Sequence, residues 1–73
     1  IIDGRYSYYD FLAYFDKEEL FTDDCKFNTI SGLIMETLHN IPQEGQIMEW
    51  EGFRLEIIDM DGVRIDKVLV SKL

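Results

Sequence analysis

Few side chains in this sequence could take part in covalent catalysis. His39 is the only histidine and Cys25 the only cysteine. A Ser-His-Asp or Cys-His arrangement would have to use His39, which falls in the last turn of a predicted helix, where an imidazole suits the negative end of the helix dipole. Cys25 follows Asp23 and Asp24, and neighbouring carboxylates disfavour the reactive thiolate. We therefore expect no catalytic residues and no enzymatic activity.

The carboxylates are numerous enough that a metal site has to be considered. Fifteen Asp and Glu residues stand against seven Lys and Arg, which gives a net charge of −8. Residues 59–62 (DMDG) resemble the first residues of a calcium-binding loop. However, the glycine comes too early and the distal glutamate is missing. The acidic residues within 16–24 are typical of a solvated surface. We therefore predict no metal site, and the scattered glycines form no phosphate-binding loop.

Charge and hydropathy exclude several classes of partner. A chain this acidic is a poor ligand for nucleic acid or an anionic bilayer, because both attract Lys and Arg. The apolar stretches are far shorter than the ~20 residues that a membrane-spanning helix needs, so we expect no direct membrane insertion. The chain begins at Ile1 rather than Met, and we expect residues 1–73 to be one domain of a longer protein. The single cysteine, without a disulfide partner, suggests a reducing compartment.

Two helices are predicted in the first half of the chain, after a short strand within residues 1–6. Ser7 and Asp10 form a capping-box pattern at the start of the first helix. Thr29 is the predicted N-cap of the second helix, which runs to about Asn40 and is ended by Pro42. Apolar residues recur at helical spacing in both segments. They are Tyr8, Phe11, Leu12 and Phe15 in the first, and Ile30, Leu33, Ile34, Leu38 and Ile41 in the second.

The last third of the chain is predicted to be a three-stranded meander, because the apolar period drops to two after Gly45. Two-residue loops at residues 51–52 and 61–62 fix its register. The register gives six cross-strand pairs: Trp50 with Phe53, Met48 with Leu55, Leu55 with Val68, Phe53 with Val70, Glu49 with Arg54, and Glu56 with Lys67. Apolar pairs then share one face and opposite charges share the other.

The tip of the second hairpin does not follow this pattern. In the predicted register, Ile58, Met60, Val63 and Ile65 face away from the core. Two interpretations remain open: a β-bulge redirects these side chains inward, or they form a small apolar patch on the outer face of the tip. In the second case they are the candidate interaction residues of the domain.

The predicted elements, in the order β-α-α-β-β-β, indicate an α+β domain. Two helices would pack on one face of a largely antiparallel sheet, as expected for a two-layer domain of this length.

Five short motifs together resemble the transporter-associated domain of the CorC/HlyC family. They are DGR at residues 3–5, NTISGLI at 28–34, IPQEG at 41–45, GFRLE at 52–56 and MDGVRI at 60–65. The resemblance spans nearly the whole chain, and the acidic segment 16–24 departs from it. It implies a fold similar to a small FAD-binding-type subdomain.

The resemblance also implies a setting. The domain would lie at the C-terminus of a bacterial CBS-domain membrane protein, on the cytoplasmic side of the inner membrane, in a family linked to magnesium and cobalt efflux and to hemolysin-like proteins. We expect a non-catalytic regulatory and interaction module, whose partners are its own CBS domains and transmembrane region, with a homodimer possible. The alternative is a small-ligand sensor for an adenine nucleotide, a flavin or a divalent cation. No cofactor is otherwise expected.

Overall fold

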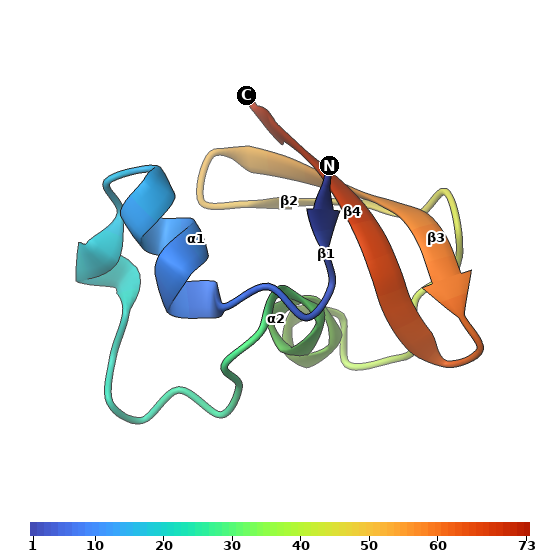
Figure 1. Ribbon diagram of the computed structural model, residues 1–73, viewed down its shortest axis with the longest axis horizontal. Coiled ribbons are helices and arrows are strands. Elements are labelled where there is room, and N and C mark those ends of the chain that lie inside the picture. The colour runs from blue at the N-terminus through green and yellow to red at the C-terminus, as the bar shows by residue number, and fades with distance from the viewer.

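The computed structural model describes all residues from 1 to 73 and confirms the α+β class. Strand β1 (Ile2–Asp3) is followed by helix α1 (Tyr8–Tyr14), a 3-10 turn η1 (Glu18–Leu20), helix α2 (Ile30–Leu38) and strands β2 (Ile47–Trp50), β3 (Phe53–Asp61) and β4 (Arg64–Lys72). The four strands form one antiparallel sheet in the order β1-β4-β3-β2. Figure 1 shows α2 beneath the sheet and α1 at its flank, toward β2 and the chain termini.

Both predicted helix caps are confirmed. The Ser7 hydroxyl accepts a hydrogen bond from the Asp10 backbone N–H (3.2 Å), and the Thr29 hydroxyl accepts one from the Gly32 N–H (3.1 Å). Each satisfies a donor that the first turn of a helix leaves without a partner. The two capping residues also form an antiparallel bridge to each other, so the two helices start side by side.

The second helix ends earlier than predicted. Its last residue is Leu38, and His39 is the C-cap in the left-handed conformation (φ 60°), with its N–H donating to the Met35 carbonyl. Ile41 is exposed rather than part of the apolar face, whereas Pro42 is buried. His39 therefore closes the helix through its backbone.

The register of β2 and β3 is as predicted. Trp50 lies opposite Phe53, Met48 opposite Leu55 and Glu49 opposite Arg54. The connecting residues Glu51 and Gly52 have φ angles of 50° and 83°, as a two-residue hairpin turn with two left-handed positions requires.

The predicted register of β3 and β4 is wrong. Leu55 lies opposite Val70, Phe53 opposite Lys72 and Glu56 opposite Leu69, a shift of two residues. The loop consists of Gly62 and Val63, because Asp61 pairs with Arg64. Gly62 has a φ of 64°, and glycine at the first of two loop positions is typical of a type II′ turn. Because the register is displaced by two residues, an even number, the β3 and β4 side chains of these pairs that were predicted to face the core still do so.

A β-bulge lies near the tip of this hairpin. The ladder passes from Ile57 opposite Val68 to Asp59 opposite Lys67 and then to Met60 opposite Ile65. Ile58 and Asp66 therefore have no residue directly opposite. Each strand gains one residue here, which reverses the alternation of its side chains between the two faces.

The core lies between the helices and the inner face of the sheet. Its buried side chains are Tyr8, Phe11, Leu12, Ile30, Leu33, Ile34, Met48, Phe53, Leu55, Ile57, Ile65 and Val68. Aromatic rings join α1 to the sheet: the Phe11 and Phe53 ring centres are 5.5 Å apart in an edge-to-face arrangement. The Phe15 ring contacts both of them, with its centre 5.2 Å from that of Phe11 and 4.7 Å from that of Phe53. Such contacts add to the free energy gained by burying the rings.

The first strand forms the edge of the sheet next to β4. Ile2 lies opposite Val68 and Asp3 opposite Lys67, and the Gly4 N–H donates to the Asp66 carbonyl (2.9 Å). Gly4 is buried, and a β-carbon at this position would overlap the Ile65 carbonyl. This glycine thus allows the chain to pass close to the bulged part of β4.

Candidate interaction site

The two residues considered for catalysis, His39 and Cys25, lie in different segments of the chain. His39 is exposed at the end of α2. Cys25 is half-buried in the connection before α2, with its Sγ 3.4 Å from the Thr22 hydroxyl. The carboxylates are mostly spread over the surface, and no group of three or more His, Cys, Asp and Glu side chains is arranged to hold a metal ion. No helix is long and apolar enough to cross a membrane.

The four candidate residues of the hairpin tip do not form one outer patch. Ile65 is only 1% exposed and belongs to the core, and Met60, opposite it, packs against the core. Ile58 and Val63 are 37% and 67% exposed. The bulge is the physical reason, because it redirects Met60 and Ile65 toward the helices. Whether Ile58 and Val63 contact a partner stays a prediction.

Charged side chains gather where β1 meets β4. The Arg5 guanidinium donates to the Asp3 carboxylate (3.2 Å), and the Lys67 ammonium lies 3.1 Å from Asp66 and 3.8 Å from Asp59. Hydrogen bonds from Arg5 lower the pKa of the Asp3 carboxyl. The hydrogen bond to Asp66 raises the pKa of Lys67. All these side chains are well exposed, so the pairs fix the local arrangement more than they stabilise the fold.

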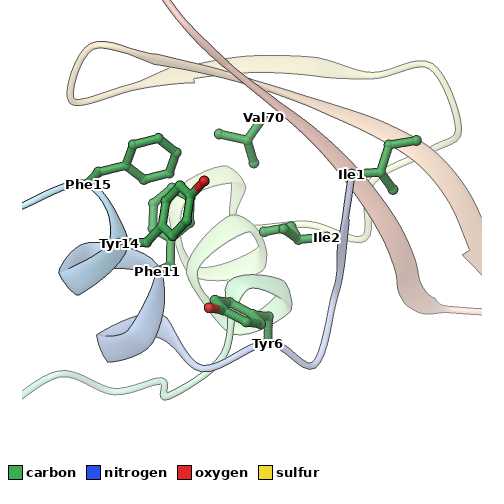
Figure 2. Close-up of a pocket in the computed structure, with 7 residues that line it drawn as sticks. All are labelled: Ile1, Ile2, Tyr6, Phe11, Tyr14, Phe15 and Val70. Carbon is green, nitrogen blue, oxygen red and sulfur yellow. The ribbon is translucent and has the colours of Figure 1, made fainter.

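An apolar groove lies between α1 and β4, on the side of β1 away from these charged pairs. Figure 2 shows Phe11, Tyr14 and Phe15 of α1 and its C-cap on one side, and Ile1, Ile2 and Val70 on the other, with Tyr6 below. The groove has a volume of about 400 Å³, and all seven residues that line it are hydrophobic. Four of the seven carry aromatic rings. Sites that bind a small molecule have volumes of this order, ~300–1,000 Å³.

One cation lies at the rim of this groove. The Lys72 ammonium is 5.7 Å from the centre of the Phe15 ring, within the range of a cation–π interaction. Of the seven Lys and Arg residues, Arg5, Arg54, Arg64 and Lys67 lie within 4 Å of a carboxylate, whereas Lys17, Lys26 and Lys72 do not. The groove therefore combines an apolar floor with a cation that has no carboxylate partner.

The groove was not predicted from the sequence. Its lining comes from both ends of the chain, and the sequence left the position of the first strand in the sheet undetermined. Tyr14 was a usable signal in the sequence, because it is a large aromatic residue outside the predicted buried face of α1. In the structure its side chain is 77% exposed.

Comparison with known proteins gives one consistent family. Residues 1–73 match the family model CorC_HlyC, described as a transporter associated domain. A UPF0053 protein from Synechocystis is 39% identical over the whole chain, and the polyamine export protein of Escherichia coli K12 is 32% identical over the whole chain. This chain spans 16% of the length of each of these relatives.

A solved structure has the same fold. The transporter associated domain CorC_HlyC of a Xylella fastidiosa hemolysin, determined in complex with Mg²⁺ and Mn²⁺, superimposes with a TM-score of 0.83 at 30% identity. The match covers 99% of this chain and 84% of that one. A chain of nearly this extent therefore folds without the rest of its parent protein.

Proposed function

We propose, from the premise that this chain belongs to the CorC/HlyC family of transporter associated domains, that it is a non-catalytic regulatory and interaction module of a membrane transport protein. Its partners in that parent protein are the CBS domains and the membrane region, and it acts on the cytoplasmic side of the inner membrane. The parent moves cations across the membrane.

The main support for this proposal is that the whole chain matches only a small part of the length of its relatives. The whole chain aligns with 16% of the E. coli polyamine export protein, so transport by such a protein depends mostly on residues outside this domain. A domain that lacks a transport pathway contributes by contacting the parts that form one. The name of that relative supports a polyamine as the transported cation, and the resemblance of the motifs supports magnesium or cobalt.

Deleting the domain from the parent protein tests its role. We expect the shortened protein to reach the membrane and to transport its cation at an altered rate, or with an altered response to cytoplasmic ligands. Measurements of transport into membrane vesicles, normalised to the amount of protein in the membrane, separate altered activity from lost expression. Unchanged transport and regulation after deletion would contradict the proposal.

A second candidate function is the binding of a divalent cation. The relative solved with Mg²⁺ and Mn²⁺ is the observation that favours it. Thermal unfolding in MgCl₂ and in NaCl of matched ionic strength tests it, because bound ligand stabilises by RT ln(1 + [L]/Kd) whereas screening acts in both salts. A saturable, magnesium-specific rise in Tm supports cation binding. Equal effects of the two salts count against it and agree with our expectation that there is no metal site.

A further inference from the structure

We propose that residues 18–26, which form a strap between α1 and α2, open as a unit while the rest of the domain stays folded, and that screening of the strap's charges by dissolved ions closes it. The strap consists of η1 and most of the loop that follows it. Figure 1 shows η1 at the outer side of α1, at one end of the long axis of the molecule. The inference rests on the proposed function, because it names a way in which a module of a cation transporter would respond to the ions around it.

The backbone of the strap is not tied to the helices or to the sheet. Its hydrogen bonds each join residues three apart, and none reaches α1, α2 or a strand. The last bond before the strap runs from the Lys17 N–H to the Leu12 carbonyl (2.8 Å), and the first bond after it runs from the Tyr8 N–H to the Asn28 carbonyl (3.0 Å). Opening between these two points therefore breaks no hydrogen bond that holds the helices or the sheet together.

Few side chains hold the strap in place. None of its residues is fully buried, and only Leu20 and Cys25 are half-buried against the core. Phe21 is 38% exposed, and its ring centre lies 6.2 Å from that of Tyr8 and 5.1 Å from that of Tyr9. A segment with few buried apolar contacts and exposed backbone hydrogen bonds opens at a lower free energy than the whole domain.

Close packing fixes the end of the opening segment at Phe27. The Phe27 ring centre is 4.9 Å from that of Tyr8 in an edge-to-face arrangement, and a β-carbon at Gly32 would lie 2.7 Å from the Phe27 β-carbon. The lack of a side chain at Gly32 thus lets Phe27 pack directly on the first turn of α2. Opening then removes Phe21 from Tyr8 and leaves Phe27 in place, so one side of the Tyr8 ring, which is 3% exposed in the closed form, becomes accessible.

Charge opposes the closed form. The strap carries Glu18, Glu19, Asp23 and Asp24 against Lys26 alone, so it holds three of the eight net negative charges of the chain. None of the five ion pairs in the structure includes a residue of the strap. The closed strap therefore lies against a body of the same sign. Salt weakens this repulsion, because the Debye length falls from about 30 Å at 0.01 M to about 10 Å at 0.1 M.

The two forms present different surfaces to the rest of the parent protein. In the closed form the Tyr8 ring is covered, and in the open form it is exposed while the acidic strap extends away from the domain. The balance between the forms then follows the concentration of ions at the surface of the domain. This gives the proposed regulatory role a physical input.

Limited proteolysis of the isolated chain measures the opening, because a protease cleaves a folded protein where its backbone opens. Chymotrypsin has a target within the strap at Phe21 and one in the sheet at Phe53, which is 1% exposed. Each cleavage rate is divided by the rate for a synthetic peptide that spans the same site, so the ratio gives the population of the open form.

We expect the ratio at Phe21 to be at least about tenfold larger than that at Phe53 and to be independent of urea below the unfolding transition. The ratio at Phe53 should rise with urea, because its cleavage requires global unfolding. Equal ratios with the same urea dependence would mean that the strap opens only when the whole domain unfolds, and would overturn the proposal.

Salt and charge variants test the closing mechanism. Raising NaCl from about 10 mM to about 500 mM should lower the Phe21 ratio at least about threefold. Asp23→Asn combined with Asp24→Asn should lower the ratio at low salt and weaken its salt dependence. Glu36→Gln combined with Glu44→Gln removes two exposed carboxylates outside the strap and is the matched control, expected to change the ratio less. A ratio that does not fall with salt, or that responds equally to the two double variants, overturns the role of the charges.

The two proposals can fail separately, since the strap is measured in the isolated chain and the regulatory role in the parent. If Phe21 is cleaved independently of Phe53 but deletion of the domain leaves transport and its regulation unchanged, the strap opens without a regulatory consequence. If deletion alters transport but the two sites are cleaved together, the module acts without an opening strap.

Discussion

Ile65 lies opposite Met60 in the β3–β4 ladder, and its side chain is in the core although simple strand alternation from Val68 would point it outward. The bulge that leaves Ile58 and Asp66 without partners reverses the alternation between these residues and the middle of the sheet. Val63, two residues before Ile65, is in the loop and exposed. One hairpin tip thus carries a core residue and a surface residue of similar chemistry.

The pair Ile65→Asp and Val63→Asp tests the bulge. Ile65→Asp places an unpaired carboxylate in the core, so we expect the domain to unfold, since domains have only about 0.05–0.15 kcal/mol of stability per residue. Val63→Asp should change the free energy of unfolding by less than about 0.5 kcal/mol. Urea denaturation followed by circular dichroism measures both. If the two variants are equally stable, the assignment of Ile65 to the core is wrong.

Phe53 and Trp50 should differ in their contribution to stability. Phe53 is 1% exposed and contacts Phe11 and Phe15, whereas Trp50 is half-buried at the edge of the sheet. We expect Phe53→Ala to cost about 3–5 kcal/mol and Trp50→Ala to cost less, although its ring also approaches Tyr8 and Phe11. The midpoints of urea unfolding give the order, and a larger loss for Trp50→Ala would contradict this description of the core.

The cap of α2 provides a third test. Thr29→Ala removes the acceptor for the Gly32 N–H, and we expect a loss of about 1 kcal/mol, or about 4–8 °C in Tm for a domain of this size. Thr29→Ser keeps the hydroxyl and is the matched control, expected to melt close to the unaltered protein. Equal losses in the two variants would mean that the methyl group, rather than the hydrogen bond, matters at this position.

The Asp3–Arg5 pair gives the domain a defined acid sensitivity. Hydrogen bonds from Arg5 lower the pKa of Asp3 in the folded state, so their stabilising contribution is full above the unfolded pKa of about 3.9. It is lost as the pH falls through the lower, folded value. Arg5→Gln should raise the Asp3 pKa toward its ordinary value. Lys67→Gln should raise it less, because the charge of Lys67 is the smallest of the causes.

Carboxyl-carbon NMR shifts of Asp3, followed through an acid titration, measure this pKa in the unaltered protein, in Arg5→Gln and in Lys67→Gln. An Asp3 pKa that does not move in Arg5→Gln would show that the pair is not formed in solution.

Local signals in the sequence predicted local structure well. Ser7 and Thr29 marked the helix starts because capping involves residues within one turn, and residues 51 and 52 fixed the first hairpin because the loop positions are defined by the dipeptide itself. The second hairpin was predicted incorrectly because Asp-Gly and Gly-Val are both acceptable two-residue loops. Tertiary packing chose between them, since the bulge then brings Ile65 into the core.

The groove depended on contacts that no local pattern reveals. Ile2 and Val70 meet there only because β1 pairs with β4, at opposite ends of the sequence. The charge on Lys72 was visible in the sequence, but its position over Phe15 follows from the corrected β3–β4 register, which sets Lys72 opposite Phe53.

The pairing of β1 with β4 also determines how the domain responds to force. The two chain ends emerge next to each other at the same end of the sheet (Figure 1), because the first strand runs antiparallel to the last. The hydrogen bonds of such a pair lie perpendicular to the strands. A pull that separates the two ends therefore loads these bonds one after another, as in opening a zipper, and not all together. Tension applied between residues 1 and 73 would detach β1 first, at low force, and would expose the whole edge of β4.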